Sequence, residues 1–153
     1  MSLRPANPAF KATVRENFSK QAVMRLLGAS LSRVAAGRVQ IELPVRPEFT
    51  QQSGFVHAGI LATIVDSAGG YAAYTLMPKG SDVLTVEFKL NFLAPCRGEK
   101  IVGEGRVVRA GRTLSVCELR VESVSGNRRE LCAIGTQTLY CARPEVLDRR
   151  TSR

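Results

Sequence analysis

The chain has 153 residues, 44% of them hydrophobic, and a mean hydropathy close to zero. These values fit one globular domain with a sizeable core and exclude a disordered chain or a bundle of membrane helices. The 22 Lys and Arg residues outnumber 13 Asp and Glu residues, and the net charge of +9 favours anionic partners. A phosphate-bearing small molecule is one such partner, and a charged surface without a specific purpose is the alternative. No nucleic acid is expected, because recognition motifs and interleaved aromatic residues are missing.

Cysteine and histidine are too few and too scattered for a metal centre. The four cysteines form no Cys-x-x-Cys pair, and His57 is the only histidine. We therefore expect no metal, no cofactor, and free thiols at Cys96, Cys117, Cys132 and Cys141. The first residues, MSLRPANPAF, contain no apolar segment of the kind that a secretory signal requires. The expected location is cytoplasmic.

The first third of the chain changes from a helical to a strand period. Residues 8–27 carry apolar side chains at roughly helical spacing, which predicts one or two short helices. In residues 38–45, RVQIELPV, apolar and polar side chains alternate, which predicts a half-buried strand with Pro44 at its end or at a sheet edge. A preceding strand at residues 29–34 is expected to pair with it through a turn at residues 35–37.

The most apolar stretch is FVHAGILATIVDSAGGYAAYTL, residues 55–76, and it carries a single carboxylate, Asp66. Its length of roughly 20 residues would suffice for a membrane span. An acid at the centre of a span would cost about 2.5–3.5 kcal/mol, however, and the rest of the chain has the pattern of amphipathic strands. We therefore predict a helix at residues 57–76 that is buried in a globular domain, without a membrane contact.

Alternating patterns continue after this helix and are separated by short turns. They predict four strands, at residues 83–93, 101–109, 113–124 and 130–140. Because tight turns join them, we expect consecutive hairpins in an antiparallel sheet against which the helix packs, an α+β fold. The expected division is an N-terminal helical segment at residues 1–28, the sheet domain at residues 29–142 and a flexible basic tail at residues 143–153.

Small residues surround Asp66 on the helical wheel. Its neighbours three and four residues away are Ala62, Thr63, Gly69 and Gly70. A glycine inside a helix costs about 1 kcal/mol relative to alanine, so the glycine pair predicts close approach by another backbone or by a ligand. An ordinary packing face with a hydrogen-bonded acid is one interpretation. The other is space for a substrate beside a partly desolvated carboxylate, which is a stronger base than one in water.

Three patterns resemble the hotdog-fold acyl-CoA thioesterases, in their phenylacetic-acid-degradation (PaaI-like) branch. They are HAGILATIVD (residues 57–66), TVEFKLNFLAP (85–95) and VVRAGRTLSV (107–116), within a resemblance that covers about residues 42–140. The resemblance implies a hotdog fold, in which an antiparallel sheet wraps one long central helix, with short helices before it. It also implies hydrolysis of an acyl-CoA, such as an aryl or medium-chain ester, to a free acid and CoA. Family members are homodimers or homotetramers whose sites are built from two subunits.

The resemblance assigns a catalytic role to four residues. Asp66 would be the general base on water or the nucleophile. The backbone N–H of Ala58, at the helix start where amide groups lack partners, would polarise the thioester carbonyl. His57 would position that carbonyl or the thiolate, and Gln51, with Gln52 beside it as a fallback, matches an Asn or Gln before the histidine.

Three further residues are assigned to substrate binding by the same resemblance. Gly59 belongs to the His-Gly-Gly motif, Thr85 would orient the attacking water, and Arg112 would meet CoA phosphates. Ala58 departs from the motif, whose middle residue is usually glycine, and an alanine would be strained if the position required a positive φ. A non-catalytic acyl-CoA binder of the same fold is the alternative function, and a hydratase of this fold ranks last.

Overall fold

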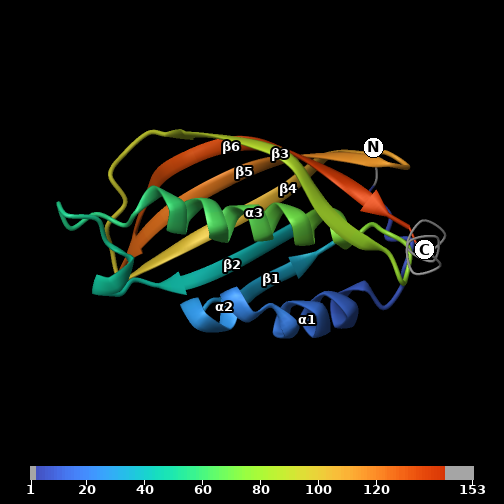
Figure 1. Ribbon diagram of the computed structural model, residues 1–153, viewed down its shortest axis with the longest axis horizontal. Helices are drawn as coiled ribbons and strands as arrows, with labels where there is room; N and C mark the ends of the chain where they lie inside the picture. The colour runs from blue at the N-terminus through green and yellow to red at the C-terminus, as the bar shows by residue number, and fades with distance from the viewer. Residues whose placement is uncertain (1–2, 144–153) are drawn as a thin grey trace, which may run out of the picture.

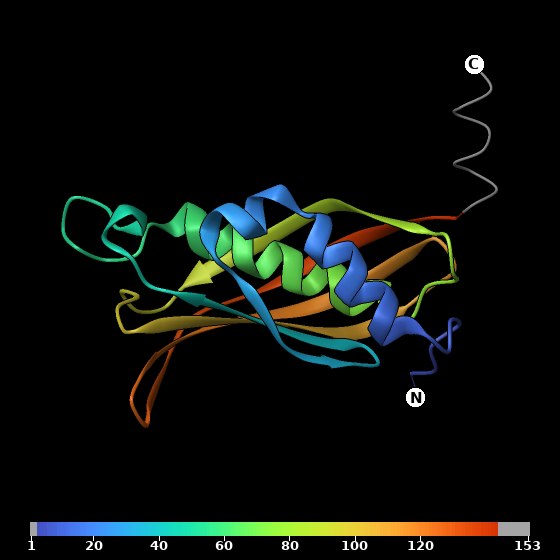
Figure 2. The same ribbon diagram turned by 90° about the horizontal axis from the view of Figure 1, so that it is seen from below.

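A six-stranded antiparallel sheet wraps around the long helix α3 in the computed structural model, which describes residues 3–143 (Figure 1). The helices are α1 (Phe10–Lys20), α2 (Ala22–Leu27) and α3 (Ala58–Tyr74), and a 3-10 turn, η1, spans Pro47–Phe49. The strands are β1 (Ser30–Ala35), β2 (Arg38–Pro44), β3 (Asp82–Phe92), β4 (Lys100–Ala110), β5 (Leu114–Ser125) and β6 (Arg128–Ala142). The expected α+β hotdog architecture is thus confirmed, and α1 and α2 lie on the same side of the sheet as α3 (Figure 2). Most of the predicted tail, residues 144–153, lies outside the described residues.

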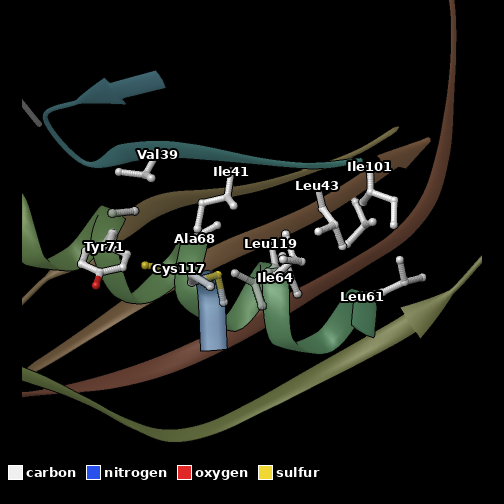
Figure 3. Close-up of a cluster of buried hydrophobic side chains, with 14 of the residues drawn as sticks. Val39, Ile41, Leu43, Leu61, Ile64, Ala68, Tyr71, Ile101, Cys117 and Leu119 are labelled. Carbon is white, nitrogen blue, oxygen red and sulfur yellow. The ribbon is translucent and has the colours of Figure 1, made fainter. Parts of the chain in front are cut away.

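The alternation along the strands explains how the sheet packs on α3. Val39, Ile41 and Leu43 are fully buried and alternate with more exposed residues along β2. They join Ile64 and Ala68 of α3 in the core (Figure 3). Burial of one such large apolar side chain contributes about 1.5–3 kcal/mol, so the sheet stabilises the apolar helix. No helix within residues 3–143 is both long and apolar enough to cross a membrane.

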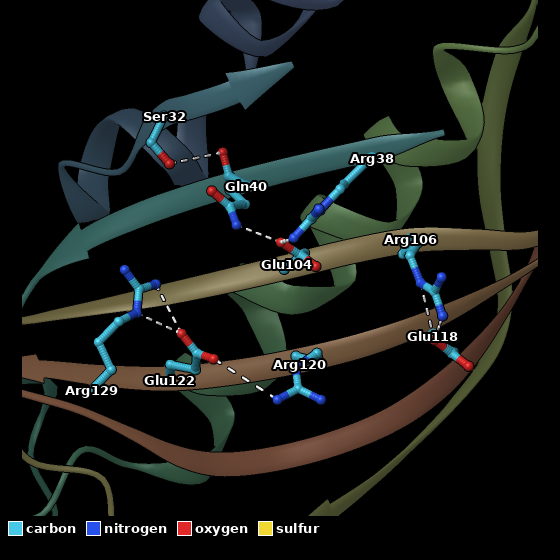
Figure 4. A network of polar contacts seen from close by, with 9 residues as sticks. All are labelled: Ser32, Arg38, Gln40, Glu104, Arg106, Glu118, Arg120, Glu122 and Arg129. Carbon is cyan, nitrogen blue, oxygen red and sulfur yellow. Dashed lines mark hydrogen bonds and ion pairs between the residues drawn. The ribbon is translucent and has the colours of Figure 1, made fainter. Parts of the chain in front are cut away.

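The face of the sheet that points away from α3 is charged (Figure 4). Ion pairs join neighbouring strands on this face. Arg38 of β2 lies 2.8 Å from Glu104 of β4, and Arg106 of β4 lies 2.6 Å from Glu118 of β5. Each pair joins one basic and one acidic side chain, so the pairs leave the net charge of +9 unchanged.

Strand β3 does not lie where the hairpin prediction places it. The sheet order is β1-β2-β4-β5-β6-β3, so β3 pairs with β6 at one edge and does not pair with β4. The prediction of four consecutive hairpins is therefore wrong at its first connection. Residues 93–99 form a longer link instead of a tight turn, and Val56 donates its N–H to the carbonyl of Cys96 in this link at 2.9 Å. With β2 and β3 both in contact with α3, the sheet can curve around the helix.

Candidate active site

His57 is the residue that caps the start of α3. Its Nδ1 accepts a hydrogen bond from the N–H of Gly59 at 2.9 Å, so a neutral His57 carries its proton on Nε2. A Cβ at position 59 would lie 3.1 Å from that Nδ1, and glycine therefore leaves room for the cap. The imidazole is exposed and can donate from Nε2 to a ligand.

The N–H of Ala58 is the donor that the first turn of α3 leaves unused. Gly59 donates to the His57 side chain, and Ile60 and Leu61 both donate to the His57 carbonyl. Ala58 is exposed, and its N–H has no acceptor among the described residues. Its φ is not positive, so an alanine in place of the usual glycine is not strained. This N–H can therefore bind a developing oxyanion.

An open cavity faces these groups and contains three of the predicted site residues. Gln51, His57 and Ala58 line it, and Gln52 lies beside them. The remaining wall is largely apolar and includes Phe55, Leu61, Phe92, Leu93, Ala94 and Pro95. The Oε1 of Gln51 accepts the N–H of Ser53, which leaves the side-chain amide N–H groups available to a ligand.

Asp66 is half-buried in the middle of α3 and is held by two side chains from the sheet. Thr85 of β3 donates its hydroxyl to Oδ1 of Asp66 at 2.7 Å. Gln137 of β6 donates from Nε2 to the same Oδ1 at 2.6 Å and to the Thr85 hydroxyl at 3.0 Å. Within the described part of the chain, Oδ2 of Asp66 has no donor, so one carboxylate oxygen is engaged and the other is available.

A second, smaller cavity lies at Asp66, and the N-terminal helices help to form it. Asp66, Thr85 and Gly70 line it together with residues of α1 and of the link to α2, Asn17 and Gln21. Tyr71 donates its hydroxyl to Asn17 Oδ1 at 3.0 Å, and burial raises the pKa of Tyr71 to about 12. The walls of this cavity are therefore largely polar.

One chain does not bring the two halves of the predicted site together. Ala58 and Asp66 are eight residues apart on α3, and a rise of about 1.5 Å per residue separates them by about 12 Å. They line different cavities. Arg112 is farther from Ala58 than Asp66 is. It follows the last residue of β4, whereas the link that contacts the residues before α3 precedes the first residue of that strand. The 11 residues of β4 extend over more than about 30 Å.

Gln137 is the contact of Asp66 that the sequence analysis missed. The sequence signal for this residue is the alternation along β6. Gln137 shares the inward face of the strand with Ala133, Leu139 and Cys141, and it is polar where the alternation predicts an apolar residue.

The structure also explains one of the two helix glycines. A Cβ at Gly69 would overlap Oε1 of Gln137, and a Cβ at Gly105 of β4 would overlap the backbone of Ala68 and Gly69. Other parts of the protein therefore fill the space at Gly69, whereas Gly70 lines the cavity at Asp66.

Comparisons with known proteins find thioesterases in sequence and in structure. Residues 53–129 match the model of the thioesterase superfamily. A thioesterase family protein from Silicibacter pomeroyi has a crystal structure that superposes with a TM-score of 0.84, at 42% identity over 86% of this chain and 97% of that chain. The proofreading thioesterase EntH of Klebsiella pneumoniae is 28% identical over 79% of this chain and 88% of its own length. Human acyl-coenzyme A thioesterase 13 is 32% identical over 60% of this chain and 66% of its own length.

Proposed function

The chain belongs to the thioesterase superfamily, and on that premise we propose that it hydrolyses an acyl-CoA, aryl or medium-chain, to a free acid and CoA in the cytoplasm. We place it in the PaaI-like branch on the motifs at residues 57–66, 85–95 and 107–116. The observation that carries the proposal is the Asp66 carboxylate, which lies in a polar cavity with one oxygen held and the other available. The names of EntH and of acyl-coenzyme A thioesterase 13 support the reaction class.

Hydrolysis proceeds in two steps when Asp66 acts as general base. Oδ2 takes a proton from water, and the water oxygen bonds to the thioester carbon while the carbonyl oxygen becomes an oxyanion on the Ala58 N–H. The carbon–sulfur bond then breaks, and the CoA thiolate leaves and takes up the proton from Asp66, which returns the carboxylate to its starting state. As a nucleophile, Asp66 would instead bond to the carbonyl carbon and expel the thiolate, and water would hydrolyse the resulting anhydride.

A single turnover in ¹⁸O-labelled water separates the general-base route from a nucleophilic route in which water attacks the aspartyl carbonyl of the anhydride. With enzyme in excess, a general base delivers labelled oxygen to the acid in the first turnover. A nucleophile delivers an unlabelled carboxylate oxygen when water attacks the aspartyl side of the anhydride.

A second copy of the chain would complete the site. β3 is an edge strand, and its apolar side chains Leu84, Val86, Phe88 and Phe92 are exposed. An exposed apolar edge strand is a template for pairing with another chain. We propose a homodimer, or a tetramer of two such dimers, in which Ala58 of one subunit and Asp66 of the other act on the same thioester.

Two arginine sites are candidates for the phosphates of CoA. Arg112 is the one expected from the resemblance. The other is a cavity that contains Arg97 and Arg128 and shares Pro95 with the cavity at Ala58. The Arg97 guanidinium lies 4.3 Å from the centroid of the Phe55 ring. A rise in KM for acyl-CoA but not for the acyl-pantetheine ester, in Arg97→Gln or in Arg112→Gln, identifies the site that is used.

The decisive experiment measures free thiol released from short, medium, long and aryl acyl-CoA esters by the wild type and by Asp66→Asn. We expect turnover of at least one ester and a loss of at least about 10²-fold in kcat in the variant, since the base is gone. Binding of CoA esters without release of thiol would instead support the alternative, a non-catalytic acyl-CoA-binding protein. An Asp66→Asn variant with full activity would remove Asp66 from the mechanism.

A further inference from the structure

Gln137 is a buried polar side chain in which only one end of the amide is paired. It is 1% exposed and lies among apolar neighbours, Leu139 of β6 and Leu119 of β5. Its Oε1 is buried without a hydrogen-bond partner in the described part of the chain. Burial of an unpaired amide oxygen is unfavourable, and a methionine of similar length would avoid it. Packing against these leucines therefore does not account for a glutamine at this position.

The groups around the Gln137 amide determine which way it points. Nε2 lies 2.6 Å from Oδ1 of Asp66 and 3.2 Å from the Asp66 backbone carbonyl oxygen, and neither atom of an ionised Asp66 can donate. An amide turned the other way would place Oε1 against these two acceptors. Only the N–H₂ end is compatible with Asp66, so the donor is directed at the carboxylate.

The same amide also orients Thr85. Its hydroxyl accepts a hydrogen bond from Nε2 of Gln137 at 3.0 Å and donates its own proton to Oδ1 of Asp66 at 2.7 Å. The three side chains come from β6, β3 and α3, so no two of them are neighbours in sequence. Both hydrogen bonds end on Oδ1, and Oδ2 is left for the reaction.

We infer that Gln137 is a positioning residue of the proposed thioesterase, which fixes Oδ1 of Asp66, orients the Thr85 hydroxyl and thereby presents Oδ2 to the water or thioester. This inference rests on the proposed function. Gln137 itself touches no substrate in this arrangement, because it is buried beneath the carboxylate. The absence of a side chain at Gly69 supports it, since a Cβ there would overlap Oε1 and displace the amide.

The test compares Gln137→Met with Leu119→Ala in the full-length protein, on the acyl-CoA that the wild type hydrolyses fastest. Gln137→Met retains the volume of the side chain and removes both N–H donors. We expect kcat to fall about 10- to 100-fold, as for the loss of a hydrogen bond to a charged group, while KM changes less than about threefold. The midpoint of thermal unfolding should fall less than in Leu119→Ala, because removal of the unpaired Oε1 offsets part of the loss of the hydrogen bonds.

Leu119→Ala is the matched control beneath the same turn of α3, since Leu119 is buried beside Gly69. It should lower the unfolding midpoint and leave kcat near the wild-type value at a temperature where the variant is folded. A second variant, Gln137→Leu, also removes both N–H donors and adds no charge, so it should lose kcat in the same way. It replaces Gln137→Met if that variant does not fold.

A double variant with Thr85→Val tests whether the two residues act as one unit. Its kcat should be close to that of the less active single variant. Two independent residues would instead give a fold-loss equal to the product of the two single fold-losses. Wild-type kcat in both Gln137 variants, or independent losses in the double variant, would overturn the inference while an active wild type and an inactive Asp66→Asn preserve the proposed function. A wild type that hydrolyses no ester would overturn both.

Discussion

The two halves of the candidate site are built from different parts of the polypeptide. At the start of α3 the proposed oxyanion donor is a backbone N–H, exposed and supplied by a residue whose side chain is irrelevant to the donor. In the middle of α3 the proposed base or nucleophile is a carboxylate that is held by side chains from β3 and β6. The first half therefore tolerates alanine in place of glycine, whereas the second depends on three residues distant in sequence.

Among changes at the start of α3, Ala58→Pro is expected to have the largest effect, because it removes the backbone N–H. Proline has no N–H but is well accommodated at the first position of a helix, and His57 already has the extended conformation that precedes proline, with φ −62° and ψ 136°. We expect kcat to fall about 10²- to 10³-fold with little change in the unfolding midpoint. Steady-state kinetics and thermal unfolding check this, with Ala58→Gly, which retains the N–H, as the active control. Full activity in Ala58→Pro would assign the oxyanion to another donor.

A mixture of two inactive variants tests whether the halves act across subunits. Ala58→Pro and Asp66→Asn subunits, unfolded together and refolded at equal amounts, should form mixed dimers in which one site carries both defects and the other carries neither. Since about half of randomly assembled dimers are mixed, about one quarter of wild-type activity should return. If the activity of the mixture stays at the level of the separate variants, both groups act in the site of one subunit. That outcome would contradict the separation of about 12 Å between Ala58 and Asp66, which is the length of eight helical residues.

The smallest effect concerns the core beneath the carboxylate half. Cys117 of β5 directs its thiol to the Gly69 carbonyl at 3.5 Å, and burial raises the pKa of this thiol from 9.0 to about 12. The folded protein thus holds the proton more tightly than the unfolded chain. Its contribution to stability is complete below about pH 9 and is lost as the pH rises from 9 toward 12, by up to about 1.4 kcal/mol per pH unit.

Urea unfolding at pH 7.5 and pH 10 measures this contribution. The two conditions lie about one unit or more below and above 9, the pH at which the loss of stability begins. The free energy of unfolding should fall less between these conditions in Cys117→Ala than in the wild type. Equal losses in both proteins would show that Cys117 does not couple to alkaline unfolding.

The order of the helix and strand segments could be predicted because each one carries its own period. Alternation in residues 38–45 and a continuous apolar run around Asp66 are local properties, and the observed β2 and α3 follow them. The residues at the start of α3 could be predicted for the same reason, since His57, Ala58 and Gly59 are consecutive and a helix terminus exposes its N–H groups wherever it occurs.

The neighbours of β3 and the role of Gln137 had no such local signal. Strand order depends on which edge lets the sheet enclose α3, and hairpin patterns describe only turns between successive strands. Gln137 is 71 residues from Asp66, and only the pairing of β6 with β3 and the gap at Gly69 bring its amide to the carboxylate. Local periodicity thus determined the elements and the backbone donor, because both are properties of short segments. The environment of the carboxylate was decided by tertiary packing, because it requires three elements to meet at one point.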